Sequence, residues 1–111
     1  MTVLARLAEI ADGAVLAVEV PGEDGPRALL VAMGPVGPVA YVNCCPHMDM
    51  PLDGGSGRVL RRRDHLFCRY HGAAFDVATG ACVGGPCTGC SLERVAVEAA
   101  DGAVRLSASP G

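Results

Sequence analysis

Two short blocks, Cys45-Pro-His47 and Cys68-Arg-Tyr-His71, decide how this chain is interpreted. Each block supplies one thiolate and one imidazole from what we expect to be a tight loop. Thiolate and imidazole side chains are ligands of transition metals, and four of them that converge on one point would hold a metal centre. The blocks therefore predict a site built from Cys45, His47, Cys68 and His71.

The stretch between the two blocks indicates how they meet. Asp53-Gly-Gly-Ser-Gly57 predicts a turn, and the apolar pieces at 58–60 and 66–67 predict a short hairpin. The blocks are then expected at the ends of neighbouring strands, facing each other. We assign the middle segment, residues 43–90, to the site.

Two kinds of metal centre fit this ligand set. Zinc accepts two cysteines and two histidines. A [2Fe–2S] cluster can have two cysteines on one iron and two histidines on the other. Zinc sites of this composition mostly pair their cysteines in one knuckle and their histidines elsewhere, whereas each block here mixes the two types. The mixture favours the two-iron cluster, because each loop then reaches both irons.

Outside the site the sequence predicts strands and turns. Fifteen glycines and eight prolines interrupt every long helical window, although one helical turn could form within 4–10 before Gly13 stops it. A dense turn signal lies at 21–26, and Asp101-Gly102 is typical of a hairpin turn. The strands that we expect lie at 14–20, 27–33, 36–43, 92–98 and 103–106. This pattern predicts a small antiparallel β domain.

Composition restricts the function classes. The chain has 111 residues, half of them hydrophobic, which predicts one globular domain over 1–111. A net charge of −3 and only four aromatic residues argue against nucleic-acid binding. No apolar run reaches the roughly 18 residues of a membrane span. Arg6 and Glu9 interrupt the first apolar stretch, so we expect no signal peptide and a cytoplasmic protein. Six cysteines then favour metal or redox chemistry over disulfides.

The ligand pattern resembles a known family. Cys-x-His followed by Cys-x-x-His, with Gly72 after the second histidine, resembles the signature of Rieske iron–sulfur proteins. Further matches in order and approximate spacing are Pro51-Leu-Asp53, 71–76, Thr79-Gly80 and Gly85-Pro86. The specific part of the resemblance covers residues 43–86, and the flanking strands are compatible with it.

The resemblance implies a fold, a cofactor and ligand roles. The implied fold is the all-β Rieske fold, with three stacked antiparallel sheets and a small cluster-binding subdomain at about 43–90. One Rieske-type [2Fe–2S] cluster is implied, with Cys45 and Cys68 on the inner iron. His47 and His71 would hold the outer iron near solvent, and Gly85-Pro86 would form a third loop that covers the cluster.

We expect the reduction potential of the cluster to be low for this family. Two neutral imidazoles in place of two thiolates make the centre easier to reduce than a plant-type ferredoxin, so Rieske centres span roughly −150 to +300 mV. High-potential members carry a disulfide between the ligand loops and a serine and a tyrosine that donate hydrogen bonds to the cluster sulfurs. At the matching positions this chain has Met50 and Tyr70 for the disulfide, Ala73 for serine and Phe75 for tyrosine. The missing donors place the expected potential near the bottom of the range.

The function that we expect from the resemblance is that of a Rieske-type ferredoxin. It would carry one electron from a flavin- or NAD(P)H-linked reductase to a terminal oxygenase and would not itself be an enzyme. The chain has no room for an oxygenase's second, mononuclear-iron domain. Three alternatives stay open: a small Rieske-like subunit of a nitrite reductase, a structural zinc module for protein contacts, and a redox or iron sensor.

Four cysteines and one histidine outside the ligand set have simpler interpretations. We interpret Cys44 as a small buried residue, with a substitute ligand as the alternative. Cys82, Cys87 and Cys90 are interpreted as buried thiols. A Cys82–Cys87 disulfide or independent thiol redox chemistry is the alternative for them. His65 is interpreted as a surface strand residue, with a spare ligand or proton carrier as the alternative.

Charged and apolar residues around the site have two interpretations each. Arg58 and the run 61–63 are interpreted as a solvated turn. They could also form a docking patch for an acidic partner, because they lie between the ligand loops. Met48 and Met50 fit either an apolar rim around the histidines or ordinary packing.

Overall fold

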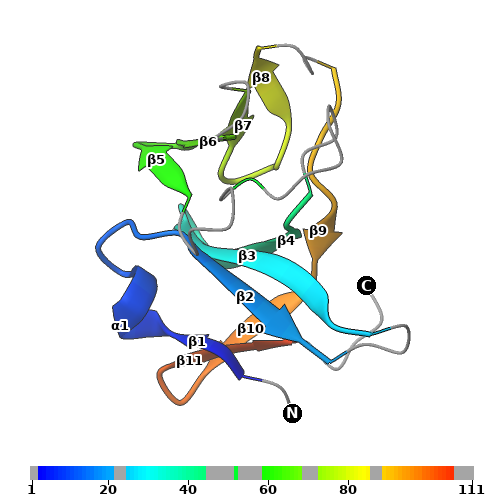
Figure 1. Ribbon diagram of the computed structural model, residues 1–111. Helices are drawn as coiled ribbons and strands as arrows, with labels where there is room; N and C mark the ends of the chain where they lie inside the picture. Colours follow the sequence, from blue (N-terminus) through cyan, green and yellow to red (C-terminus); the bar gives the residue numbers. More distant parts are fainter. Residues whose placement is uncertain are drawn as a thin grey trace.

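A computed structural model describes residues 3–21, 25–44, 52, 59–68, 73–85 and 89–106 of the chain (Figure 1). The described residues form three antiparallel sheets. The lower sheet has the strand order β1 (Val3–Arg6), β11 (Ala103–Leu106), β10 (Val97–Ala100). The middle sheet has the order β2 (Leu16–Val20), β3 (Arg27–Gly34), β4 (Gly37–Val42), β9 (Arg94–Val95). The upper sheet has the order β5 (Leu60–Arg62), β6 (His65–Phe67), β7 (Ala74–Asp76), β8 (Cys82–Gly84). The expected all-β class with three antiparallel sheets is confirmed.

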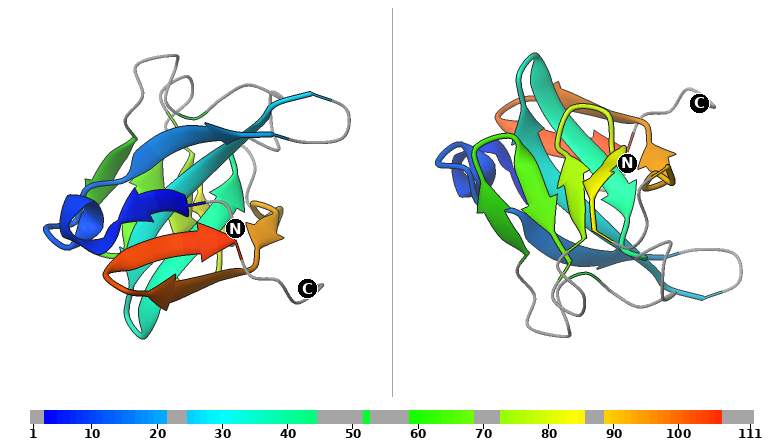
Figure 2. Two further views of the ribbon diagram at one scale, coloured as in Figure 1. Left: turned by 90° about the horizontal axis from the view of Figure 1, so that it is seen from below. Right: turned by 90° about the horizontal axis from the view of Figure 1, so that it is seen from above.

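The middle sheet is covered on both faces, which explains its continuous apolar runs (Figure 2). On β3, Leu29 and Val31 belong to the core shared with the lower sheet, whereas Leu30 and Ala32 belong to the core shared with the upper sheet. All four are buried. Side chains alternate between the two faces of a strand, so a strand between two cores needs an apolar residue at every position.

The lower sheet contains one expected hairpin and one strand that we did not expect. Ala100 pairs with Ala103 across Asp101 and Gly102, whose φ angles of 52° and 75° fit a two-residue hairpin turn. The possible helical turn at 4–10 shrinks to α1 (Leu7–Ile10), because the preceding residues form β1 and pair with β11. No helix among the described residues is long and apolar enough to cross a membrane.

The single strand expected at 92–98 is wrong as one element. It divides at Ala96 into β9, which pairs with β4 of the middle sheet, and β10, which pairs with β11 of the lower sheet. The chain therefore passes from one sheet to the other inside one run of alternating sequence. In packed-sheet folds a strand can change sheets at a bend, and alternation alone does not reveal the bend.

The upper sheet begins with the expected hairpin. β5 and β6 pair with Arg62 opposite His65, so the turn is Arg63 and Asp64, and Arg63 takes a φ of 54°. β7 and β8 were not predicted, because segment 43–90 was assigned to the site as a whole. The turn between them is organised by Asp76, whose carboxylate oxygen accepts hydrogen bonds from the backbone N–H groups of Ala78 and Thr79.

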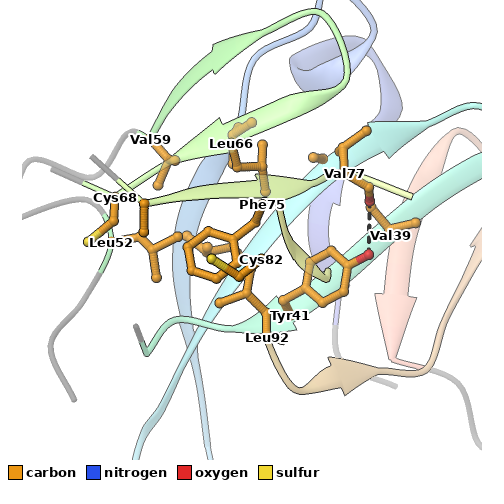
Figure 3. Packing of buried hydrophobic residues seen from close by; sticks show 14 residues of the cluster. Val39, Tyr41, Leu52, Val59, Leu66, Cys68, Phe75, Val77, Cys82 and Leu92 are labelled. Carbon is orange, nitrogen blue, oxygen red and sulfur yellow. Dashed lines mark hydrogen bonds between the residues drawn. The ribbon is translucent and has the colours of Figure 1, made fainter. Parts of the chain in front are cut away.

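Tyr41 on β4 joins the upper sheet to the middle sheet. Its hydroxyl donates a buried hydrogen bond of 2.8 Å to the carbonyl oxygen of Val77 (Figure 3). Its ring passes so close to Gly80 that a Cβ there would lie 2.7 Å from the ring. Burial raises the pKa of the Tyr41 hydroxyl, Arg94 opposes this shift, and Asp76 adds to it. The neutral phenol therefore fits this place between the sheets.

A second link joins the sheets at the hairpin end. The Arg61 guanidinium donates to the carbonyl oxygen of Met33 at 2.8 Å, and its Nε donates to that of Arg63 at 2.7 Å. Arg61 is half-buried, whereas Arg62 and Arg63 are exposed. The interpretation of this run as a solvated turn therefore holds for two of its three arginines, and Arg61 joins two sheets. Arg58 lies outside the described residues.

Candidate metal centre

One of the four predicted ligands, Cys68, lies among the described residues. Cys45, His47 and His71 lie outside them, as do Met48, Met50 and Tyr70. The structure nevertheless describes the residues from which each predicted loop starts and to which it returns.

The first loop leaves the middle sheet at the end of β4. Asn43 is buried, and its side-chain oxygen accepts a 2.8 Å hydrogen bond from the backbone N–H of Leu52. Leu52 is fully buried. The chain therefore leaves and re-enters the core at one place, and residues 45–51 lie between these two points. Cys44 is half-buried here, not the fully buried residue that we expected.

The second loop connects β6 and β7. Its base is closed by a 2.9 Å hydrogen bond from the backbone N–H of Cys68 to the carbonyl oxygen of Ala73. Both residues are buried, at 2% and 0% exposure. Cys68 belongs to the same cluster of buried side chains as Leu52 (Figure 3). The two predicted ligand loops therefore start from one core.

A third loop packs against the second. Gly85 follows β8 with a φ of +88°, and a Cβ there would lie 2.8 Å from the Cα of Ala73 and 3.3 Å from its nitrogen. Only glycine combines this backbone conformation with such a close approach. The loop returns at Cys90, whose carbonyl oxygen accepts a 2.9 Å hydrogen bond from the N–H of Cys82. Pro86 and Cys87 lie outside the described residues.

At two described positions this chain lacks the hydrogen-bond donors that high-potential Rieske proteins carry. Ala73 and Phe75 are both fully buried, and neither side chain carries a hydroxyl group. The residues expected at the other two positions, Met50 and Tyr70, lie outside the described part.

The exposure of Cys82, Cys90 and His65 tests how these residues were interpreted from the sequence. Cys82 is buried, as expected, but Cys90 is exposed, so its interpretation as a buried thiol is wrong. Cys90 is at the mouth of a loop, where burial depends on neighbouring chain segments that local sequence does not identify. His65 is a half-buried residue of β6, which confirms its strand position.

Sequence reasoning missed Asn43 and Tyr41. A polar residue that ends the apolar strand 37–42, just before two cysteines, is a signal that could have revealed Asn43, because asparagine side chains often bind backbone groups at such ends. Tyr41 stands inside the apolar run, and nothing local distinguishes it from an ordinary core residue. Asn43 closes the base of the first predicted loop, and Tyr41 joins the middle sheet to the turn that follows β7.

A [2Fe–2S] cluster fits the donors that the chain offers. The sequence contains the two thiols and two imidazoles that such a cluster needs in its histidine-ligated form. Cys68 stands at a buried loop base, and Gly85, which follows β8, packs closely on Ala73 at this base. A buried thiolate would be costly without a cation, so this position suits a metal ligand.

Comparisons with known proteins match most of the chain to one family. Residues 1–101 match the family model of the Rieske [2Fe-2S] domain. A search of curated proteins finds no match.

Solved structures resemble the chain over nearly its full length. The Sphingomonas yanoikuyae B1 ferredoxin is 25% identical, with a TM-score of 0.72, and the similarity covers 97% of this chain and 98% of that one. The ferredoxin of carbazole 1,9a-dioxygenase from Nocardioides aromaticivorans IC177 is 21% identical, with a TM-score of 0.71 and coverage of 96% and 95%. The terminal oxygenase of that dioxygenase is 22% identical, with a TM-score of 0.77, but 98% of this chain covers only 30% of the oxygenase.

Proposed function

Since the chain belongs to the Rieske [2Fe-2S] domain family, we propose that it is a one-electron carrier of the ferredoxin type. It takes an electron from a reductase and passes it to a terminal oxygenase. The observation that carries the proposal is the end-to-end similarity to the Sphingomonas ferredoxin, which covers 98% of that protein. The much larger oxygenase is matched over 30% of its length.

Family membership implies one Rieske-type [2Fe–2S] cluster. When bound, this cluster takes up and releases one electron at a time without bond chemistry on a substrate. We propose Cys45 and Cys68 as ligands of one iron and His47 and His71 as ligands of the other. The proposal treats 1–111 as one domain whose cluster-binding part is about 43–90. The burial of Cys68 supports the inner position for its iron.

The chain's own residues supply a rigid support for the ligands. The hydrogen bond between Asn43 and Leu52 holds the two ends of the first loop together, and that between Cys68 and Ala73 does the same for the second. Such supporting contacts limit the change in geometry between the oxidised and reduced states. Small rearrangement between states is what an electron carrier needs in order to exchange electrons quickly.

The first experiment is an absorption and EPR spectrum of the purified protein before and after reduction with dithionite. A red-brown protein whose reduced form shows the EPR signal of a histidine-ligated [2Fe–2S] cluster is expected. A colourless protein that contains one zinc ion would overturn the proposal and leave a structural interaction module.

Matched cysteine variants test the ligand assignment. Cys68→Ser is expected to remove the red-brown absorption, whereas Cys82→Ser, also buried in the same core cluster, is expected to retain it. The neighbouring pair Cys45→Ser and Cys44→Ser repeats the comparison on the first loop. Loss of the absorption in Cys44→Ser with its retention in Cys45→Ser would reassign that ligand.

Electron delivery distinguishes a carrier from a sensor. The reduced protein is mixed with a candidate terminal oxygenase in a stopped-flow spectrometer, and reoxidation of the carrier is followed by its visible absorption. Reoxidation in step with reduction of the oxygenase is expected. A reduced protein that transfers no electron to any terminal oxygenase tested would reject the carrier role, even if the cluster is present.

A further inference from the structure

Two cysteines lie opposite each other along the backbone at the base of the third loop, and the proposed ligand set uses neither. Cys82 begins β8, and Cys90 stands where the chain returns from the loop. Residues 82–90 include Gly85, whose backbone packs against Ala73 at the base of the second loop. Any bond between the two cysteines would therefore close a loop that includes this contact between Gly85 and Ala73.

The backbone places the two cysteines as a direct cross-strand pair. Ala81 and Ser91 form an antiparallel bridge, and the N–H of Cys82 donates to the carbonyl oxygen of Cys90 at 2.9 Å. Side chains that are directly opposite in an antiparallel pair lie on the same face of the sheet. Residues that are opposite each other in an antiparallel pair have Cα atoms roughly 4.5 to 5.5 Å apart, which lies within the roughly 4.4 to 6.8 Å seen in disulfides.

The two sulfurs differ in access to solvent. Cys90 is exposed, so its sulfur can meet a dissolved oxidant. Cys82 is 6% exposed, and its thiol donates to the carbonyl oxygen of Gly84 at 3.2 Å. An exposed thiol that reacts first and a sheltered one that reacts second is the arrangement used in thiol–disulfide exchange.

We propose that Cys82 and Cys90 form a disulfide when the protein meets a low-molecular-weight disulfide such as oxidised glutathione. The Cys90 thiolate attacks one glutathione sulfur, breaks the glutathione S–S bond and releases one glutathione thiolate. Cys82 then loses its proton to water and attacks the Cys90 sulfur, which expels the second glutathione. Two cysteine thiols are oxidised, and one glutathione disulfide is reduced to two thiols.

The crosslink fixes the third loop at its base. It replaces the hydrogen bond from Cys82 to the Gly84 carbonyl with a covalent bond to Cys90, and residues 82–90 become a closed ring. The ring restrains Gly85 against Ala73, so we expect the oxidised protein to keep its cluster longer on heating. This consequence rests on the proposed function, whereas formation of the disulfide does not.

Peptide mapping of the holoprotein tests the bond itself. Trypsin cleaves after Arg69 and Arg94, so Cys82, Cys87 and Cys90 lie in one peptide, 70–94. In a Cys87→Ser protein that peptide has only the proposed pair. After treatment with oxidised glutathione and then N-ethylmaleimide, it is expected to carry no label and to lack the mass of two hydrogen atoms. Reduction with dithiothreitol should restore two labels.

The control is the Cys90→Ser protein, which keeps Cys82 and Cys87. No crosslink within the peptide is expected there, and a crosslink in that protein together with two labels in the Cys87→Ser protein would reassign the bond to Cys82 and Cys87. A Cys87→Ser peptide that takes two labels after oxidation, or that carries glutathione on Cys90 without ring closure, overturns the proposal.

Thermal bleaching gives the second readout. Oxidation is expected to raise the midpoint for loss of the visible absorption by about 10 °C in the Cys87→Ser protein and to leave the Cys90→Ser midpoint unchanged. If the protein proves to be colourless, the proposed function fails while the peptide result still decides the disulfide. A crosslinked peptide without a rise in the midpoint refutes the restraint of the third loop on the second.

Discussion

Replacement of Gly85 by alanine should destabilise the site through two separate effects. The φ of +88° is unfavourable for a residue with a side chain, at a cost of about 1 to 3 kcal/mol. The new Cβ would also lie 2.8 Å from the Cα of Ala73, a backbone atom held by the hydrogen bond between Cys68 and Ala73. The strain needed to fit the Cβ against this backbone atom costs about a further 1 to 3 kcal/mol. We therefore expect a total loss of about 2 to 6 kcal/mol in the free energy of unfolding.

Gly89→Ala is a matched control at the other end of the same loop. Gly89 has a φ of +100°, and among the residues that the structure describes a Cβ there has no heavy atom within 4 Å, so we expect only the conformational cost of about 1 to 3 kcal/mol. Urea unfolding of both holoproteins is followed by far-ultraviolet circular dichroism and by visible absorption. Gly85→Ala should unfold at lower urea and lose its colour faster than Gly89→Ala. Equal midpoints in the two variants would show that the third loop does not press on the second.

Three further predictions address the hydrogen bonds of Tyr41 and Asn43 and the reduction potential of the cluster. Tyr41→Phe should lower the free energy of unfolding by about 1 to 3 kcal/mol, because a buried carbonyl oxygen loses its donor. Because the pKa of Tyr41 is raised on folding, its contribution to the free energy of unfolding is complete below pH 10.0 and is lost as the pH rises through the folded-state pKa. Urea unfolding at high pH should therefore show a larger loss of stability in the wild type than in the Tyr41→Phe variant. Asn43→Ala should cost about 1 to 3 kcal/mol and speed loss of the visible absorption, because the buried N–H of Leu52 loses its acceptor. The reduction potential should lie near the lower limit of about −150 mV, since Ala73 and Phe75 offer no hydroxyl donors, and protein-film voltammetry that gives a value well above zero would refute this.

Local sequence was sufficient where a single strand or turn decides its own conformation. Within the strand predicted at 27–33, residues 29–32 are apolar at successive positions because β3 is buried on both faces there, and its place in the sheet follows. The dipeptide Asp101-Gly102 accepts the positive φ angles of a tight hairpin, so the pairing of β10 with β11 could be predicted. In both cases the physical cause lies within a few residues of the element.

Local sequence failed where the conformation depends on a distant partner. Residues 3–6 form a strand because the edge of β11 offers them backbone hydrogen bonds, which the possible helical turn at 4–10 does not reveal. The run 92–98 divides between two sheets because both β4 and β11 have an open edge near it. Contacts so far apart in the chain leave no signature in the spacing of apolar residues.

The two cysteine–histidine blocks, read from the sequence alone, determined the kind of metal centre and the family, because ligand type and spacing are properties of the chain itself. The assignment of Cys45, His47, Cys68 and His71 stays a prediction. The tertiary structure alone decided what supports that centre: Asn43 reaching Leu52, and Gly85 lying against Ala73. These contacts join segments from different sheets and loops, and folding must bring such segments together before the contacts exist.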